Sequence, residues 1–149
     1  MSAAETSALS VRPIESAPDL KRVYPVFAEL RPHLDEATFV AQVQRQRAQC
    51  GYTLVAGEVA GRPVTGAGYR VVEHLAWGKA VYLDDLVTAT TEHGHGYGGA
   101  LLDWVIAEAR RLGCRQFHLD SGTQRHAAHR LYLSRHLRIS AFHFSTALT

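Results

Sequence analysis

The sequence predicts a single α/β domain in which helices flank a mixed, mostly antiparallel sheet. The chain has 149 residues, the usual length of one domain. Apolar residues recur at helical spacing in some segments and form short runs bounded by turn residues in others. These segments give the order β-α-α-β-β-β-α-β-α-β. We expect strands at 10–14, 52–59, 64–75, 80–88, 114–120 and 138–148, and helices at 19–30, 36–49, 98–112 and 124–137.

The first two helices carry recognisable start and stop signals. Ser16 can cap the first helix, with Asp19 in its first turn, and Pro25 should kink or split that helix because proline removes a backbone donor. Asp35 is placed to cap the second helix, and Gly51 is placed to end it.

In the middle of the chain the apolar residues no longer recur at helical spacing, and their short runs predict an antiparallel meander. Two turn-like triplets separate its three apolar runs, Gly61-Arg62-Pro63 and Trp77-Gly78-Lys79. The helix that follows has an apolar face ended by Gly113. "RISAFHFSTAL" (138–148) is the predicted last strand.

Composition excludes several classes of protein. The net charge is only +2, and basic residues are scattered, so we expect no nucleic-acid partner. The two cysteines, Cys50 and Cys114, form no disulfide framework or zinc motif. Neither a signal peptide nor a membrane-spanning apolar run is evident, so the expected location is the cytoplasm. We expect residues 1–9 to be a flexible tail and 10–149 to form the domain.

A glycine-rich run precedes the third helix. Gly94 to Gly99 satisfies G-x-G-x-x-G, the dinucleotide-binding fingerprint, and Asp120 lies about twenty positions further on. That reading fails because a polar run, 89–93, separates the glycines from the preceding strand and too few residues follow Asp120. A Walker A loop fails as well, since no Gly-Lys-Ser/Thr closes the run.

The run still favours anion binding. Glycines allow successive backbone N–H groups to converge on an anion, and the helix that begins near Gly98 adds the partial positive charge of its N-terminus. A diphosphate is the expected ligand.

The segment "VYLDDLVTATTEHGHGYGGALLDWVIAEARRLG" resembles the acetyl-CoA-binding segment of the GNAT superfamily of N-acetyltransferases, whose signature is Q/R-x-x-G-x-G/A. The resemblance extends from about residue 10 onward. It implies an acetyl-CoA-dependent N-acetyltransferase that acts on a primary amine of a small molecule or peptide, and homodimers are common in the family. The chain departs from the signature at His93, where Gln or Arg is usual, and at His95, where a basic residue is common. In the closing helix the family pattern Asn-x-x-Ala-x-x-x-Tyr becomes Arg125-x-x-Ala128-x-x-x-Tyr132, and the Gly-Phe that usually follows is His136-Leu137.

The resemblance also implies site residues. Tyr132 is the expected general acid, and Asp84 or Asp85 the expected base; strict alternation along a strand would let only one of the two face the cleft, and Asp85 is favoured. The strand end is expected to bind the pantetheine arm and the loop the diphosphate. These cofactor-binding residues are Leu86, Val87, Thr88, His93, Gly94, His95, Gly96, Tyr97, Gly98, Gly99 and Ala100.

Other readings of the chain remain open. His118, Asp120, His126 and His129 match no metal-ligand spacing, so no metal is predicted, although His118 or His129 could serve as another base. The main alternative function is a non-catalytic CoA-binding sensor or regulatory module, and a weaker one is a nicotinamide enzyme.

Overall fold

The computed structural model describes residues 8–149, and most of the predicted tail, 1–7, lies outside the described residues. Internal contacts divide the chain into a first unit that ends at His118 and a second unit, Leu119–Thr149. The predicted single domain, 10–149, spans most of the first unit and all of the second, and its boundaries stay a prediction. The elements are β1 (Ser10–Pro13), α1 (Ala17–Leu30), α2 (Glu36–Cys50), β2 (Thr53–Val59), β3 (Arg62–His74), β4 (Gly78–Thr88), the 3-10 helix η1 (Thr90–Glu92), α3 (Tyr97–Arg111), β5 (Gln116–Leu119) and α4 (His126–Ser134).

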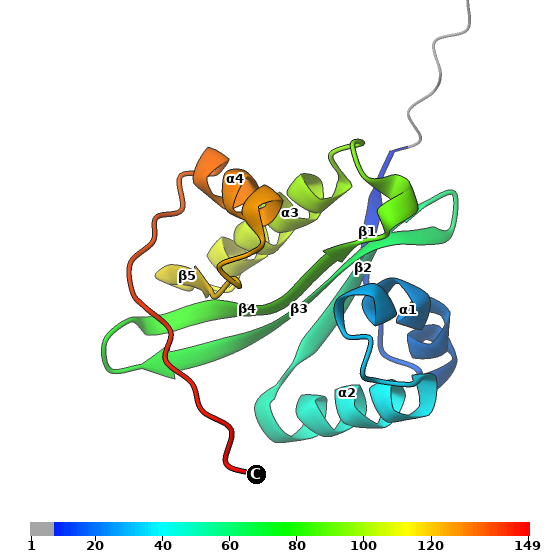
Figure 1. Ribbon diagram of the computed structural model, residues 1–149, viewed down its shortest axis with the longest axis horizontal. Coiled ribbons are helices and arrows are strands. Elements are labelled where there is room, and N and C mark those ends of the chain that lie inside the picture. The colour runs from blue at the N-terminus through cyan, green and yellow to red at the C-terminus, as the bar shows by residue number, and fades with distance from the viewer. Residues whose placement is uncertain (1–7) are drawn as a thin grey trace, which may run out of the picture. The chain divides into compact units, whose positions relative to one another are not determined.

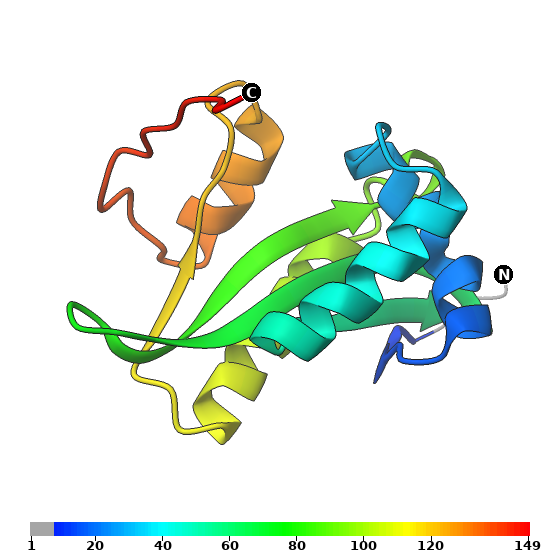
Figure 2. The ribbon, with the colours of Figure 1, turned by 90° about the horizontal axis from the view of Figure 1, so that it is seen from below.

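The strands form one sheet in the order β1-β2-β3-β4-β5. Neighbours from β1 to β4 pair antiparallel, so the predicted meander is confirmed, as is the mixed and mostly antiparallel α/β class. In the first unit, α1 and α2 cover one face of the sheet and α3 covers the other (Figures 1 and 2). The sheet is therefore the middle of three layers.

The helix caps lie where the sequence places them. The Ser16 hydroxyl accepts the backbone N–H of Asp19, and the Asp35 carboxylate accepts that of Thr38. Gly51 follows α2 in the left-handed conformation, with φ +67°. These contacts satisfy groups at the helix ends that have no intrahelical partner.

Of the two effects predicted for Pro25, a split of α1 is wrong, because the helix runs uninterrupted from Ala17 to Leu30, and a kink stays a prediction. Its buried face extends to both sides of the proline. We attribute the continuity to this packing, which outweighs the loss of one backbone hydrogen bond. The buried residues are Leu20, Val23, Val26 and Phe27.

The β2–β3 turn is shorter than predicted. It consists of Ala60 and Gly61, both with positive φ (+50° and +75°), so Arg62 and Pro63 already belong to β3. Two successive residues of positive φ match the right-handed twist of the flanking strands.

Phe27 anchors α1 to the sheet. Its ring is 5.5 Å from that of Phe39 in α2. It also lies against Gly66 in β3, where an added Cβ would come within 2.4 Å of a ring carbon. A glycine in mid-strand thus marks a close approach between helix and sheet.

In the second unit, α4 contains one buried residue, Tyr132. The prediction of a strand at 138–148 is wrong, since residues 137–149 form neither helix nor strand. Ile139, Phe142 and Phe144 are 80%, 85% and 90% exposed. Their apolar positions fall on both alternations of a strand, so no single face is specified, and α4 offers no backbone ladder to pair with.

We expect Gly66→Ala to destabilise the protein by about 1–3 kcal/mol, because the new methyl group would displace the Phe27 ring. Urea unfolding followed by circular dichroism measures the loss. Glu73→Ala, an exposed position on the same strand, is the control and should change the free energy of unfolding by less than about 0.5 kcal/mol.

A second substitution tests the cause. Phe27→Leu shortens the side chain that Gly66 contacts, so the double variant should lose less than the sum of the two single variants. Strict additivity of the two losses would contradict this contact.

Candidate active site

Strand β4 contains a bulge at the two predicted acidic residues. Gly68 of β3 pairs with Asp85, whereas the next residue, Tyr69, pairs with Leu83, so Asp84 is the extra residue. The insertion shifts the alternation of side chains and places Asp85 on the face of Gly68 and Arg70. Our expectation of strict alternation between Asp84 and Asp85 is therefore wrong at this point.

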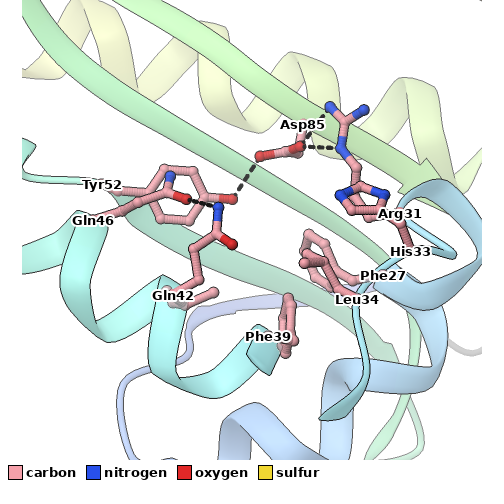
Figure 3. A pocket seen from close by; sticks show the side chains of 10 residues that line it. Phe27, Arg31, His33, Leu34, Phe39, Gln42, Gln46, Tyr52 and Asp85 are labelled. Atoms are coloured by element: carbon pink, nitrogen blue, oxygen red, sulfur yellow. Dashed lines mark hydrogen bonds and ion pairs between the residues drawn. The ribbon is translucent and has the colours of Figure 1, made fainter. Parts of the chain in front are cut away.

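Asp85 is held by two donors from elsewhere in the fold (Figure 3). Its Oδ1 accepts Nε (3.0 Å) and Nη2 (2.8 Å) of Arg31, the residue that follows α1. Its Oδ2 accepts the hydroxyl of Tyr52 at 2.7 Å. The Asp85 side chain is 15% exposed and that of Arg31 is 44% exposed. The carboxylate is thus fixed in position with its charge opposed.

Asp84 has a different partner. Its two oxygens accept Nε and Nη2 of Arg70, both at 2.9 Å, in a bidentate pair. The Arg70 guanidinium also lies 5.2 Å from the centre of the Tyr82 ring. The bond to Asp84 raises the pKa of Arg70. Both carboxylate oxygens of Asp84 are therefore used in a contact between β3 and β4.

Tyr52 reaches Asp85 because Gly68 has no side chain. A Cβ at Gly68 would lie 1.7 Å from the Tyr52 hydroxyl oxygen. Burial, followed by the charge of Asp85, raises the pKa of Tyr52 well above its usual value of 10.0. Tyr52 therefore remains a protonated donor to Asp85. Sequence reasoning gave no role to Tyr52 or Arg31; for Tyr52, the glycine in mid-strand was the available signal.

A pocket of about 270 Å³ opens beside Asp85 on the face covered by α1 and α2 (Figure 3). Most of its polar lining comes from α2 and the segment after α1, and its apolar lining from the core between the helices. The lining residues are Phe27, Arg31, His33, Leu34, Phe39, Gln42, Val43, Gln46, Tyr52 and Asp85.

The glycine-rich run forms an exposed loop between η1 and α3. Gly94 and Gly96 have φ of +88° and +80°, conformations that side chains disfavour. Gly96 precedes α3 and has no side chain with which to cap it. The first backbone hydrogen bond of the helix runs from Ala100 N–H to Gly96 O. The N–H groups of Tyr97, Gly98 and Gly99 thus form the donor-rich end of α3.

Contacts with α1 and with the end of β4 hold η1 and the start of this loop in place. Glu29 of α1 accepts the backbone N–H of Thr90 at 3.0 Å. His93 donates from Nε2 to the carbonyl oxygen of Thr88 at 3.0 Å, so its side chain contacts the end of β4. The rings of His95 and Tyr97 stack with centroids 5.4 Å apart. The predicted phosphate contacts of His93 and His95 stay predictions.

The predicted pantetheine residues lie at the end of β4. Leu86, Val87 and Thr88 pair with β3 on one side. The other neighbour of β4 is β5. Just before β5, the Arg115 N–H donates to the carbonyl oxygen of Lys79, which lies near the start of β4. The end of β4 thus lies well beyond the point where β5 begins.

Tyr132 belongs to the second unit, where it is 9% exposed in α4. Burial raises its pKa from 10.0, so the phenol is protonated at neutral pH. Two predicted histidines of this unit contact each other or the backbone: the His126 and His129 rings are 6.0 Å apart, and His129 Nε2 donates to Gly122 O.

Residues 8–149, the part of the chain that the structure describes, contain neither a metal-binding cluster nor a membrane-spanning helix. No group of three or more His, Cys, Asp or Glu side chains in this part of the chain could hold a metal ion. No helix there is long and apolar enough to cross a membrane.

Comparison with known proteins identifies the family, since residues 17–136 match the Acetyltransferase (GNAT) family. The chain belongs to the GNAT acetyltransferases. It is 33% identical over 126 residues to the uncharacterized N-acetyltransferase YhdJ of Bacillus subtilis (strain 168), covering 83% of this chain and 87% of that protein.

Two solved structures share the GNAT fold of this chain. A transcriptional regulator from Bacillus halodurans C-125 has a TM-score of 0.83 at 18% identity, covering 95% of this chain and 100% of that one. The aminoglycoside N-acetyltransferase AAC(6')-Iy in complex with CoA has a TM-score of 0.81 at 13% identity, covering 99% of each chain.

The loop is compatible with the acetyl-CoA that GNAT enzymes use. Nothing lies within 4 Å of the position that a Cβ would occupy at Gly94 or Gly96, so both glycines border open space. Backbone donors that end a helix beside such space suit a diphosphate. A Cβ at Gly98 would lie 2.9 Å from the Thr88 hydroxyl, so Gly98 lets α3 approach the end of β4.

The raised pKa of Tyr52 predicts a loss of stability at alkaline pH. A tyrosine in the unfolded chain ionises near pH 10, whereas folded Tyr52 stays protonated, so the free energy of unfolding should fall as pH rises above about 10. Tyr52→Phe should make this fall less steep. Urea unfolding between pH 8 and about pH 11 measures both slopes, and equal slopes would refute the assignment.

Proposed function

We propose that this GNAT enzyme transfers the acetyl group of acetyl-CoA directly to a primary amine of a small molecule or peptide. One observation carries the proposal. Asp85 reaches the pocket between α1 and α2, and three residues later β4 ends at Thr88 and leads to the glycine-rich loop. A single strand thus connects a carboxylate in a pocket with a donor-rich helix end.

Backbone groups form the proposed binding site for acetyl-CoA, the acetyl donor. Acetyl-CoA, when bound, supplies the thioester. The N–H groups from His95 to Gly99 would contact its diphosphate, and the backbone of Leu86 to Thr88 would align the pantetheine arm. Because glycines leave these amides accessible, affinity depends little on the charge state of His93 or His95.

Asp85 is the proposed base. A lysine-like amine has a pKa near 10.4 and must lose a proton before its nitrogen attacks the thioester carbon. Asp85 lines the pocket, whereas Asp84 is not part of its lining and is bound by Arg70 in a bidentate pair. Asp85 would take the proton directly or through a water molecule.

Tyr132 is the proposed acid. As the new C–N bond forms and the C–S bond breaks, the departing thiolate needs a proton. A buried phenol whose pKa is raised holds its proton at neutral pH and can donate it. The role rests on the match of Ala128 and Tyr132 to the family pattern and on this burial.

A non-catalytic CoA sensor is the second candidate. It is favoured by the departures at His93, Arg125 and His136 from the family pattern and by the resemblance to a protein named as a transcriptional regulator. A sensor would bind acetyl-CoA but release no CoA with any amine.

We expect Gly96→Ala to weaken acetyl-CoA binding at least tenfold, because the left-handed backbone at Gly96 orients the donor groups of the loop. Isothermal titration calorimetry measures the affinity. Gly61→Ala is a matched control, since Gly61 also has positive φ (+75°) and open space around its Cβ position. Equal affinities of the two variants would place the diphosphate elsewhere.

We expect Asp85→Asn to lower kcat by a factor of about 10²–10⁴, the usual effect of removing a general base. Asp84→Asn should lower it much less, and Tyr132→Phe should slow release of the thiol while acetyl-CoA binding is kept. Steady-state release of CoA, detected with a thiol reagent, measures each rate. Wild-type binding without release on any amine would instead establish the sensor.

A further inference from the structure

The charge balance of the pocket restricts which amine it can accept. We propose that the acceptor is a compact monoamine with one ammonium group and an apolar body, an alkylamine or arylalkylamine. The inference rests on the proposed transfer function. It concerns only the pocket of the first unit beside Asp85.

The pocket contains a single carboxylate, and a neighbouring positive charge already balances its negative charge. Among the described residues that line it, Asp85 is the only carboxylate, and Arg31 binds its Oδ1 through two nitrogens. The other basic or titratable groups in the lining, His33 and Tyr52, add no anion. A second ammonium group on the acceptor would therefore lose its hydration without gaining a partner.

An anionic acceptor is disfavoured for a complementary reason. Two nitrogens of the Arg31 guanidinium are directed to Asp85, and the second also lies 3.3 Å from the carbonyl oxygen of Asp84. A carboxylate that recruited Arg31 would have to compete with these contacts. An α-amino acid therefore fits less well than the amine without its carboxylate.

The rest of the pocket lining favours an acceptor whose remaining part is apolar. Phe27, Phe39 and Val43 are buried, and Leu34 is partly buried, so a ring or alkyl chain would contact carbon on several sides. Gln42 donates to Gln46 across one turn of α2 at 3.0 Å, which leaves this side polar but uncharged. The volume of about 270 Å³ lies just below the usual range for small-molecule sites, so the acceptor is compact.

Two matched pairs of amines test the inference. Hexylamine and 1,6-diaminohexane differ by a second ammonium group, and phenethylamine and phenylalanine differ by a carboxylate. We expect the first member of each pair to have a kcat/KM at least tenfold higher in the CoA-release assay. A preference for the diamine or for phenylalanine would overturn the proposal.

Arg31→Gln tests whether the ion pair sets this preference. Loss of the guanidinium leaves Asp85 unopposed, so the ratio of kcat/KM for the diamine to that for hexylamine should rise about tenfold. Arg45→Gln is the matched control, since Arg45 is exposed on α2 and is not part of the lining. An unchanged ratio in Arg31→Gln would overturn the assignment of selectivity to this pair.

Direct binding separates this inference from the transfer function. The four amines are titrated onto the wild type and Arg31→Gln, with and without CoA, by calorimetry. Selective binding of hexylamine and phenethylamine without turnover would support the pocket assignment and refute the transferase. Turnover that favours the diamine would support the transferase and refute the pocket assignment. Failure of all four amines to bind would also refute the pocket assignment.

Discussion

The extra residue in β4 is the constraint on which the candidate site depends. If the pairing of Gly78 to Leu83 continued without it, Gly68 would pair with Asp84, and Asp85 would point to the face covered by α3. With it, Asp85 points to the face where Arg31 and Tyr52 can reach it. A one-residue change of register thus decides whether the fold has a carboxylate in the pocket.

Two glycines of β3 connect this site to the core. Gly66 makes room for Phe27, and Gly68 makes room for the Tyr52 hydroxyl. Phe27 also lines the pocket and packs on Phe39, which lines it too. The side chains that fix α1 and α2 against the sheet are therefore the same ones that shape the pocket, so its dimensions follow from core packing.

Local signals allowed much of the fold to be predicted, and long-range pairing explains most of the rest. The caps at Ser16, Asp35 and Gly51 involve neighbours within a few residues, so a single sequence reveals them. The bulge and the Arg31–Asp85 pair join residues far apart in the chain, and no local pattern encodes them. The absent strand at 138–148 has the same cause, because a strand forms only with a neighbour to complete its hydrogen bonds.

The Arg31–Asp85 pair reconciles two demands on one carboxylate. A carboxylate that takes a proton from an amine must keep its orientation, and it must also leave a lone pair open to the amine. Two Arg31 nitrogens bind Oδ1, whereas Tyr52 alone binds Oδ2, so Oδ2 keeps one lone-pair direction for an approaching amine or water. The contacts that hold Asp85 in place thus leave one acceptor position of its carboxylate unused.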